Sequence, residues 1–199
     1  MSTYKGIQGT AVTNYAGDKP GVVDGEVWYD STAADFKYQY LNITTAGAWS
    51  TGGVLNTGRN EISGAGTSNT SALAFGGYIP PGTFYANTET YNGTSWTEVN
   101  DLIAARRGLA GIGTATSALG VGGNPTASGT PVVASNESWN GTSWTEVGDL
   151  NTARASAGGA GADNTSGLVF GGDVPPATGV TESWNGSSWT EVADLNTAR

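Results

Sequence analysis

The chain has 199 residues, 32 of them glycine, and only 13% of its residues are charged. It contains no cysteine and no histidine, which excludes disulfides, thiolate or histidine zinc sites and a Ser-His-Asp triad. The net charge is −9 and no basic cluster is larger than Arg106-Arg107, which argues against nucleic-acid binding. No apolar run is long enough to span a membrane, and the first residues do not have the pattern of a signal peptide.

The composition favours an all-β fold over disorder. Seven tryptophans and eight tyrosines are too many aromatic residues for a disordered chain. Abundant glycine, alanine, serine and threonine suits many short strands joined by tight turns. At this length we expect one or two domains with a hydrophobic core.

Residues 1–47 form a first segment that does not share the pattern of the rest, and they hold all three lysines. Two aromatic runs, 27–29 and 36–41, flank a polar turn, which predicts a β-hairpin. A lone hairpin is barely stable in water, so we expect this segment to pack on the repeats, on sister chains or on a larger assembly. The aromatic residues expected to make that docking contact are Trp28, Tyr29, Phe36, Tyr38 and Tyr40.

One pattern recurs along residues 48–199. A tryptophan is followed ten residues later by an arginine, and successive arginines are 47, 48 and 45 residues apart. A fixed period in this range indicates a repeat architecture. We expect a partial unit at 49–59, which supplies the last strand of a preceding unit, and complete units at 60–106, 107–154 and 155–199. The repeated residues include Trp96, Trp144, Trp189, Arg59, Arg106 and Arg154.

Each complete unit is predicted to contain four strands. A glycine- and alanine-rich stretch comes first, and an apolar run ending in a glycine pair follows it after a polar turn. The last two strands flank an Asn-Gly pair, which is typical of a hairpin with a type I′ turn because that turn needs positive φ at both central residues. The glycine pairs are Gly76 and Gly77, Gly122 and Gly123, and Gly171 and Gly172.

Residue size changes along each unit in a way that fits a wedge. The first two strands carry small residues that can crowd near an axis, while the last two carry the aromatic residues. The order of glycine pair, aromatic residue, tryptophan and arginine resembles kelch repeats over about residues 48–199. The resemblance implies a kelch-like β-propeller, whose blades are four-stranded antiparallel sheets, and it implies no particular substrate. The spacing from Tyr91 to Trp96 is tighter than in most kelch repeats.

The first segment has a resemblance of its own. The string D-G-E-V-W-Y-D-S-T-A-A-D-F-K-Y at 24–38 is similar to hairpins near the N-termini of bacteriophage tail-fibre and other virion appendage proteins. Its combination with kelch-like repeats is similar to structural proteins of tailed phages. This resemblance implies a virion location, contacts with other virion proteins through the first segment, and a homo-oligomer, with a trimer favoured.

The number of repeats leaves the closure of such a ring open. Three complete units and one partial unit are fewer than the blades of most closed propellers, which have four to eight. The natural chain could continue beyond residue 199, several chains could share one ring, or the repeats could stack without closing. We favour the first explanation, in which residues 49–55 complete the terminal blade.

Glutamates recur at the same two places in every unit. Identical copies indicate one structural role, because a glycosidase needs a single pair of carboxylates at a defined separation. The expected partners are the recurring arginines, in bidentate pairs that link strands or blades. The aspartates Asp101, Asp149 and Asp194 are expected to be turn or capping residues, and no metal site is expected. The glutamates are Glu89, Glu137 and Glu182 in the third strand and Glu98, Glu146 and Glu191 in the fourth.

The units differ most between the glycine pair and the third strand. From the second glycine to the glutamate the distances are 12, 14 and 10 residues. A rigid scaffold with variable loops is a common way to build a binding surface; the alternative is that these loops merely tolerate change. Aromatic residues in the first loop are candidates for stacking on sugar rings. The candidate binding residues are Tyr78, Phe84, Tyr85, Asn124 and Asp173.

The sequence therefore predicts a virion appendage component, such as a tail fibre, whose repeats display loops to a glycan or protein on the host surface. A decoration or collar protein without a receptor is the alternative. A propeller enzyme acting on polysaccharide is least favoured, because only Asp163 and Asp173 break the symmetry of the acidic residues. We expect no catalytic residue and no cofactor.

Overall fold

The structure is a computed structural model that describes residues 13–16, 27–38 and 51–199. The chain divides into two compact units, 1–50 and 51–199, which are described separately. All regular structure in the described residues is β-strand, which confirms the predicted all-β class. No helix that could cross a membrane occurs in the described ranges.

The first unit contains the predicted hairpin. Strands β2 (Val27–Asp30) and β3 (Asp35–Tyr38) pair antiparallel. The Asp30 carboxylate accepts hydrogen bonds from the backbone N–H groups of Thr32 and Ala33, which holds the turn. Strand β1 (Thr13–Tyr15) adds to β2 in parallel, a pairing the sequence did not predict. The end of the predicted second strand, with Tyr40, lies outside the described residues.

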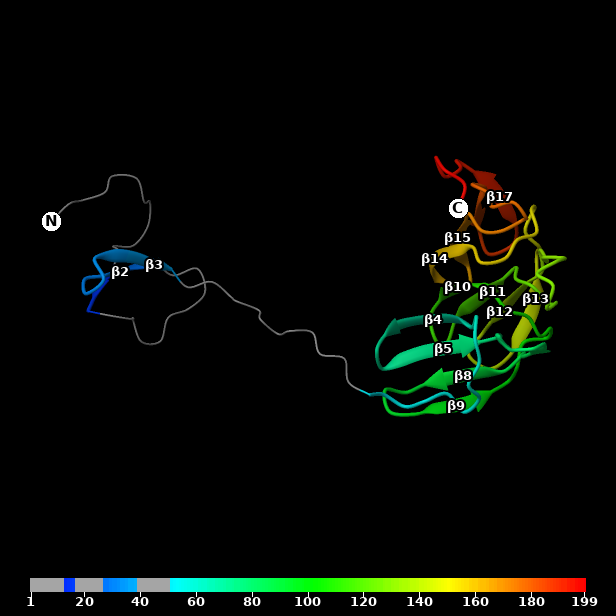
Figure 1. The fold of residues 1–199 in the computed structure, drawn as a ribbon, viewed down its shortest axis with the longest axis horizontal. Coiled ribbons are helices and arrows are strands. Elements are labelled where there is room, and N and C mark those ends of the chain that lie inside the picture. The colour runs from blue at the N-terminus through cyan, green and yellow to red at the C-terminus, as the bar shows by residue number, and fades with distance from the viewer. Residues whose placement is uncertain (1–12, 17–26, 39–50) are drawn as a thin grey trace. The chain divides into compact units, whose positions relative to one another are not determined.

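The second unit contains three four-stranded antiparallel sheets, each made by one repeat (Figure 1). This confirms the prediction of four strands per unit. A two-stranded hairpin, β6 (Tyr78–Ile79) and β7 (Thr83–Phe84), lies in the first loop between second and third strands. The first sheet contains β4 (Ser63–Ser68), β5 (Ser71–Phe75), β8 (Thr88–Tyr91) and β9 (Trp96–Val99); the second, β10 (Ala110–Gly113), β11 (Ala118–Val121), β12 (Asn136–Trp139) and β13 (Trp144–Val147); the third, β14 (Gly158–Asp163), β15 (Ser166–Phe170), β16 (Thr181–Trp184) and β17 (Trp189–Val192).

The three sheets lie side by side through their first strands, β4, β10 and β14. Glycine allows this close approach of backbones. A Cβ on Gly111 would overlap the carbonyl oxygen of Gly64, and a Cβ on Gly159 would lie 2.9 Å from the carbonyl oxygen of Gly111. The small residues of the first strands are therefore required by the neighbouring sheet.

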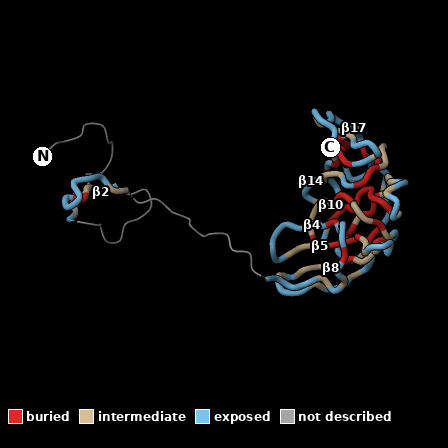
Figure 2. The backbone as a smooth tube through the Cα atoms, viewed as in Figure 1, coloured by how far each residue is buried: buried red, intermediate tan, exposed pale blue. Residues whose placement is uncertain are grey.

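Aromatic side chains fill the space between the sheets. We call the face of each sheet that carries the outer tryptophan its leading face, and the opposite face its trailing face. On the trailing face of the first sheet, the Phe75 ring lies 4.9 Å from the Trp144 ring of the second sheet. A Cβ on Gly120 would come within 3.2 Å of Phe75, so the missing side chain makes room for the ring. Figure 2 shows buried residues gathered where the second sheet meets its neighbours.

The contact between the second and third sheets uses different sizes at the same positions. Val121 replaces the phenylalanine of the trailing face, and Val169 replaces the glycine of the leading face. Both valines belong to one buried cluster with Trp189. One contact packs a large residue against glycine, and the other packs two valines. Both combinations fill a similar volume, as close packing requires.

The Asn-Gly turns are four-residue loops, and the type I′ prediction is wrong. Among their residues only Gly93, Gly141 and Gly186 have positive φ, between 90° and 94°. The Asn92 carboxamide oxygen accepts hydrogen bonds from the N–H groups of Thr94 and Ser95 at 2.9 and 3.0 Å. Because the asparagine side chain organises the loop, its own backbone needs no left-handed conformation.

Equivalent residues at the entrance to the first strands form a chain of hydrogen bonds. The Gly108 N–H donates to the Glu61 carbonyl at 3.1 Å, and the Ser156 N–H donates to the Gly108 carbonyl at 2.7 Å. All three residues have positive φ, at 51°, 62° and 54°. Outside glycine this conformation costs about 1–2 kcal/mol, so the bonds between units hold the two non-glycine residues in place.

Residues 51–59 contain no strand, although the sequence predicted the fourth strand of a preceding unit at 49–59. Residues 51–59 instead lie against the first four-stranded sheet, where Asn56 and Arg59 bind Glu89 and the Gly53 carbonyl accepts from Trp96 Nε1. Trp49 and Ser50 lie outside the described residues.

We predict that Gly111→Ala lowers the free energy of unfolding by about 1–3 kcal/mol, because the new methyl group overlaps the Gly64 backbone. Gly64→Ala is the matched control, since its Cβ would meet only the Leu73 carbonyl, at 3.2 Å. Urea unfolding of both variants measures the difference. Equal effects of the two substitutions would contradict the assigned sheet contact.

Candidate functional site

A buried ion pair joins the arginine that ends each of the first three repeats to the third-strand glutamate of the next repeat. The N–O distances are 2.6 Å for Arg59 and Glu89, 2.6 Å for Arg106 and Glu137, and 2.8 Å for Arg154 and Glu182. At most 3% of any of these side chains is exposed. The pairing of arginine with third-strand glutamate that the repeats predict is thus present in all three units.

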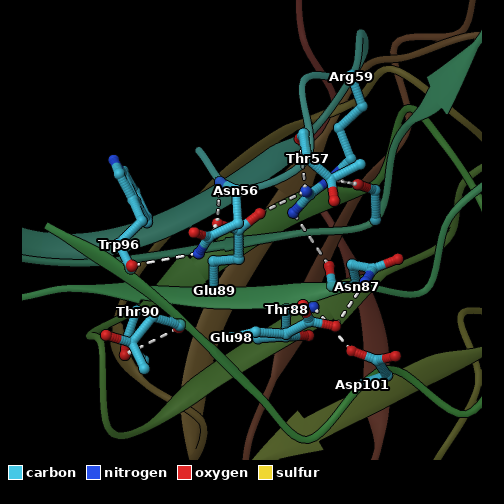
Figure 3. A network of polar contacts seen from close by, with 12 residues as sticks. Asn56, Thr57, Arg59, Asn87, Thr88, Glu89, Thr90, Trp96, Glu98 and Asp101 are labelled. Atoms are coloured by element: carbon cyan, nitrogen blue, oxygen red, sulfur yellow. Dashed lines mark hydrogen bonds and ion pairs between the residues drawn. The ribbon is translucent and has the colours of Figure 1, made fainter. Parts of the chain in front are cut away.

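The geometry of the first pair differs from the bidentate form that the sequence suggested. One Glu89 oxygen accepts from Arg59 Nη1, while the other accepts from both the backbone N–H and the carboxamide of Asn56, at 2.7 and 3.0 Å (Figure 3). Arg59 Nε donates to the Gly76 carbonyl at 2.7 Å, and its other nitrogens reach the carbonyls of Thr57 and Asn87. Because the second Glu89 oxygen accepts from Asn56, the remaining N–H groups of Arg59 donate to backbone carbonyls.

These contacts tie the segment that enters each sheet to that sheet. Glu137 accepts from the N–H of Ile103 at 2.6 Å, and Glu182 accepts from the N–H of Asn151 at 2.7 Å. Ile103 and Asn151 both lie in the connection from the preceding sheet. Removing one partner of a buried pair typically costs 3–5 kcal/mol. The repeated arginines and third-strand glutamates therefore have a structural role.

Burial and hydrogen bonding act against each other on the charge of Glu89. Burial raises the pKa of Glu89. Hydrogen bonds from Arg59 and Asn56, together with the Arg59 charge, lower it by more than burial raises it, so the pKa lies below its usual value. In the pair of Arg154 with Glu182, burial lowers the pKa of Arg154, and the charges of Glu182 and Asp194 oppose this. Arg154 Nε and Nη1 have no hydrogen-bond partner there, so this pair is the least satisfied of the three.

The other recurring acids have different surroundings. Glu98, Glu146 and Glu191 are exposed on the outer strands. Asp101 and Asp194 accept hydrogen bonds from the backbone N–H groups that begin the third strands, at 3.1 and 3.0 Å. No group of acidic residues in the described ranges is arranged to hold a metal ion.

The candidate binding residues lie at the end of the sheets where the second strands finish. Tyr78, Asn124 and Asp173 occupy equivalent positions directly after the glycine pairs. Each forms a β-bridge to the residue that follows a repeated arginine, namely Asn60, Arg107 and Ala155 respectively. Asp173 is exposed, whereas Asn124 is buried and its carboxamide oxygen accepts from the N–H and hydroxyl of Thr126. Asn124 therefore supports its loop instead of facing solvent.

The aromatic residues of the first loop form a cluster. Tyr78, Phe84 and Tyr85 are half-buried, not fully exposed. The Tyr78 and Phe84 rings lie 5.5 Å apart across the β6–β7 hairpin, and the Arg107 guanidinium lies 4.6 Å from the centre of the Tyr78 ring. Arg107 also forms an ion pair with Glu61. We call Tyr78, Phe84, Arg107 and Glu61 the loop cluster.

Sequence reasoning missed Arg107 and Glu61. The signal was the doubled arginine at 106–107, since the equivalent positions after Arg59 and Arg154 hold Asn60 and Ala155. The first arginine is buried in its ion pair with Glu137, and the second lies over the Tyr78 ring with 17% of its side chain exposed.

No protein-family model matches this chain, and a search of curated proteins finds no significant match.

We predict that Ile103→Asn stabilises the protein by about 1 kcal/mol. Ile103 is 63% exposed, and at its position the other units have Asn56 and Asn151. The Asn151 carboxamide donates to Glu182 at 2.8 Å and to the Trp189 carbonyl at 3.1 Å; such bonds to a charged group are worth about 1.5–3 kcal/mol when buried. Asn151→Ile is the matched reverse variant and should destabilise. Thermal and urea unfolding measure both, and the same sign for the two would contradict this.

We predict that Glu89 makes the fold acid-sensitive. Its folded pKa lies below the usual 4.5, so its stabilisation is complete above that value and is lost as pH falls through the folded pKa. Glu89→Gln should be less stable than the natural chain at pH 7, and the difference should shrink in acid. Urea unfolding across this pH range measures the effect; a gap that stays constant would refute it.

Proposed function

We infer that this chain is a structural component of a tailed-phage virion, a tail fibre or related appendage, in which a kelch-like β-propeller displays loops that recognise the host. The observation that carries this proposal is a constant frame beneath variable loops. Residues 1–50 would dock on other virion proteins or form trimers, and the three four-stranded sheets of residues 51–199 would be blades. Support for blades comes from three four-stranded sheets that meet through their glycine-rich first strands.

The frame is the same in every unit. The second glycine of each pair donates its N–H to the carbonyl of the arginine that closes the unit: Gly77 to Arg106 at 2.9 Å, Gly123 to Arg154 at 2.9 Å, and Gly172 to Arg199 at 2.8 Å. The loops that leave this frame differ in length and residue type. Variable loops on a repeated rigid scaffold favour a binding surface.

The loop cluster favours a glycan as the host ligand. The aromatic pair, with the Arg107 cation over the Tyr78 ring and the Glu61 carboxylate bound to that cation, offers both apolar surface and hydrogen-bonding groups for a sugar. The hairpin places the two rings, and the contacts of Arg107 with Tyr78 and Glu61 place the charges, before a ligand arrives, which lowers the entropic cost of binding. Several copies on one particle would turn weak contacts into strong attachment.

Two measurements test the proposal. Antibodies against residues 51–199 should label purified virions, and soluble protein should compete with phage for adsorption to host cells. Arg107→Ala with Phe84→Ser should weaken that competition at least tenfold. Thr94→Ala is the control, because Thr94 is exposed in the Asn-Gly loop at the opposite end of the strands.

The outcomes separate the alternatives. Full competition by the loop variant would reject the loop cluster as the receptor site. A chain that is present in virions but never competes would favour a decoration or collar protein. Absence of the chain from virions would overturn the virion assignment.

A further inference from the structure

Within residues 51–199, no sheet covers either outer face of the stack of three sheets, although the residues of these faces match faces that are buried elsewhere in the same chain. Leu73, Leu119 and Leu168 occupy equivalent positions on the three trailing faces. Leu73 is 1% exposed and Leu119 is 0% exposed because the next sheet covers them, whereas Leu168 is 40% exposed. The trailing face of the third sheet thus has the composition of a buried interface.

The leading face of the first sheet is open in the same way. An apolar groove of about 420 Å³ runs over it, lined by residues that include Gly64, Ala72 and Trp96. The equivalent Trp144 and Trp189 are each 6% exposed beneath a preceding sheet. Gly64 is equivalent to Gly111, whose missing side chain admits the backbone of the sheet before it, but the described chain places no backbone there.

The two open faces are complementary in size. Where the first sheet meets the second, Phe75 lies against Gly120. The open trailing face offers Phe170 at the position of Phe75, and the open leading face offers Ala74 at the position of Gly120. A large residue therefore faces a small one again, which is the arrangement already packed inside the molecule.

The two open faces are also complementary in hydrogen bonding. Trp144 Nε1 donates to Thr88 Oγ1 of the preceding sheet at 2.9 Å. The third sheet has Thr181 at the position of Thr88, and the first sheet has Trp96 at the position of Trp144. Trp96 Nε1 instead donates to the Gly53 carbonyl at 3.2 Å, so residues 51–59 satisfy it in place of a preceding sheet.

Residues 51–59 also occupy the site that such a sheet would need. The sequence L-N-T-x-R occurs at 55–59 and again at 195–199. Asn56 and Arg59 hold Glu89 as Asn151 and Arg154 hold Glu182. A third sheet placed against the first would bring its own Asn196 and Arg199 to Glu89, where the same two residue types are already bound.

We propose that the trailing face of the third sheet binds the leading face of the first sheet of a second copy of this chain, with residues 195–199 replacing residues 55–59 of that copy at Glu89. Like replaces like at the buried carboxylate, so the exchange changes few contacts there. The net gain is the burial of Leu168, Phe170 and Trp96. The proposal rests on the equivalence of the repeats and not on the proposed function.

The contact is heterologous, since it joins two different surfaces. Such contacts build a ring when the rotation closes and a filament when it does not. Residues 55–59 thereby act as an internal cap that limits the assembly until it is displaced.

Sedimentation velocity on the full chain, from micromolar to millimolar concentration, tests the proposal. The weight-average mass should rise at least twofold over this range. Leu168→Asp and Arg199→Ala should each abolish this rise with concentration, and both residues are exposed, so the fold should tolerate the changes. Gly64→Ala should also suppress assembly. Thr145→Asp, an exposed position on the covered second sheet with the same change of charge, should assemble like the natural chain.

Two results would overturn the proposal. One is a mass that stays constant over the whole concentration range. The other is a rise in mass that persists in Leu168→Asp, which would place the contact on another surface, such as the first unit. Circular dichroism of each variant confirms that the sheets are retained.

Discussion

The buried carboxylate on each third strand is the constraint on which the rest of the molecule depends. An ionised group removed from water must be paired and fully hydrogen-bonded. Glu89, Glu137 and Glu182 meet this demand by collecting an arginine and backbone N–H groups from the segment that enters the sheet. The path of each connection, and with it the position of each sheet beside the last, follows from satisfying one charge.

Buried polar groups without a hydrogen-bond partner mark positions where the repeats differ. The second sheet has Asn136 at the position of Thr88, which accepts from Trp144 in the first contact. The Asn136 carboxamide instead accepts from the Gly122 N–H and donates to the Gly148 carbonyl. Trp189 Nε1 is consequently left without a partner. The third arginine, Arg154, leaves two nitrogens unpaired. Both of these unpaired groups lie where the second sheet meets the third.

A frame that is fixed by buried charge leaves the loops free to vary. The glycine pairs and arginines bond the same backbone atoms in each unit, so insertions between them do not disturb the core. The loop cluster shows the result. Strands β6 and β7 bring Tyr78 and Phe84 together on a hairpin found in only one repeat of the described chain, and Arg107 from the connection to the next sheet lies over the Tyr78 ring. The residues of the loop cluster are therefore distinct from the buried pairs that stabilise the sheets.

The sequence by itself determined the period of the repeats, the four strands of each unit and the residue types of the buried pair, because repetition and alternation are properties of the chain. Only the tertiary structure decided how the pair is made, with backbone donors taking the second carboxylate oxygen. It also decided that Glu61 and Ser156 adopt positive φ, that β1 joins β2 in parallel, and that Arg107 covers Tyr78. Each of these depends on a neighbour far away in the sequence, whose position follows from packing and not from local pattern.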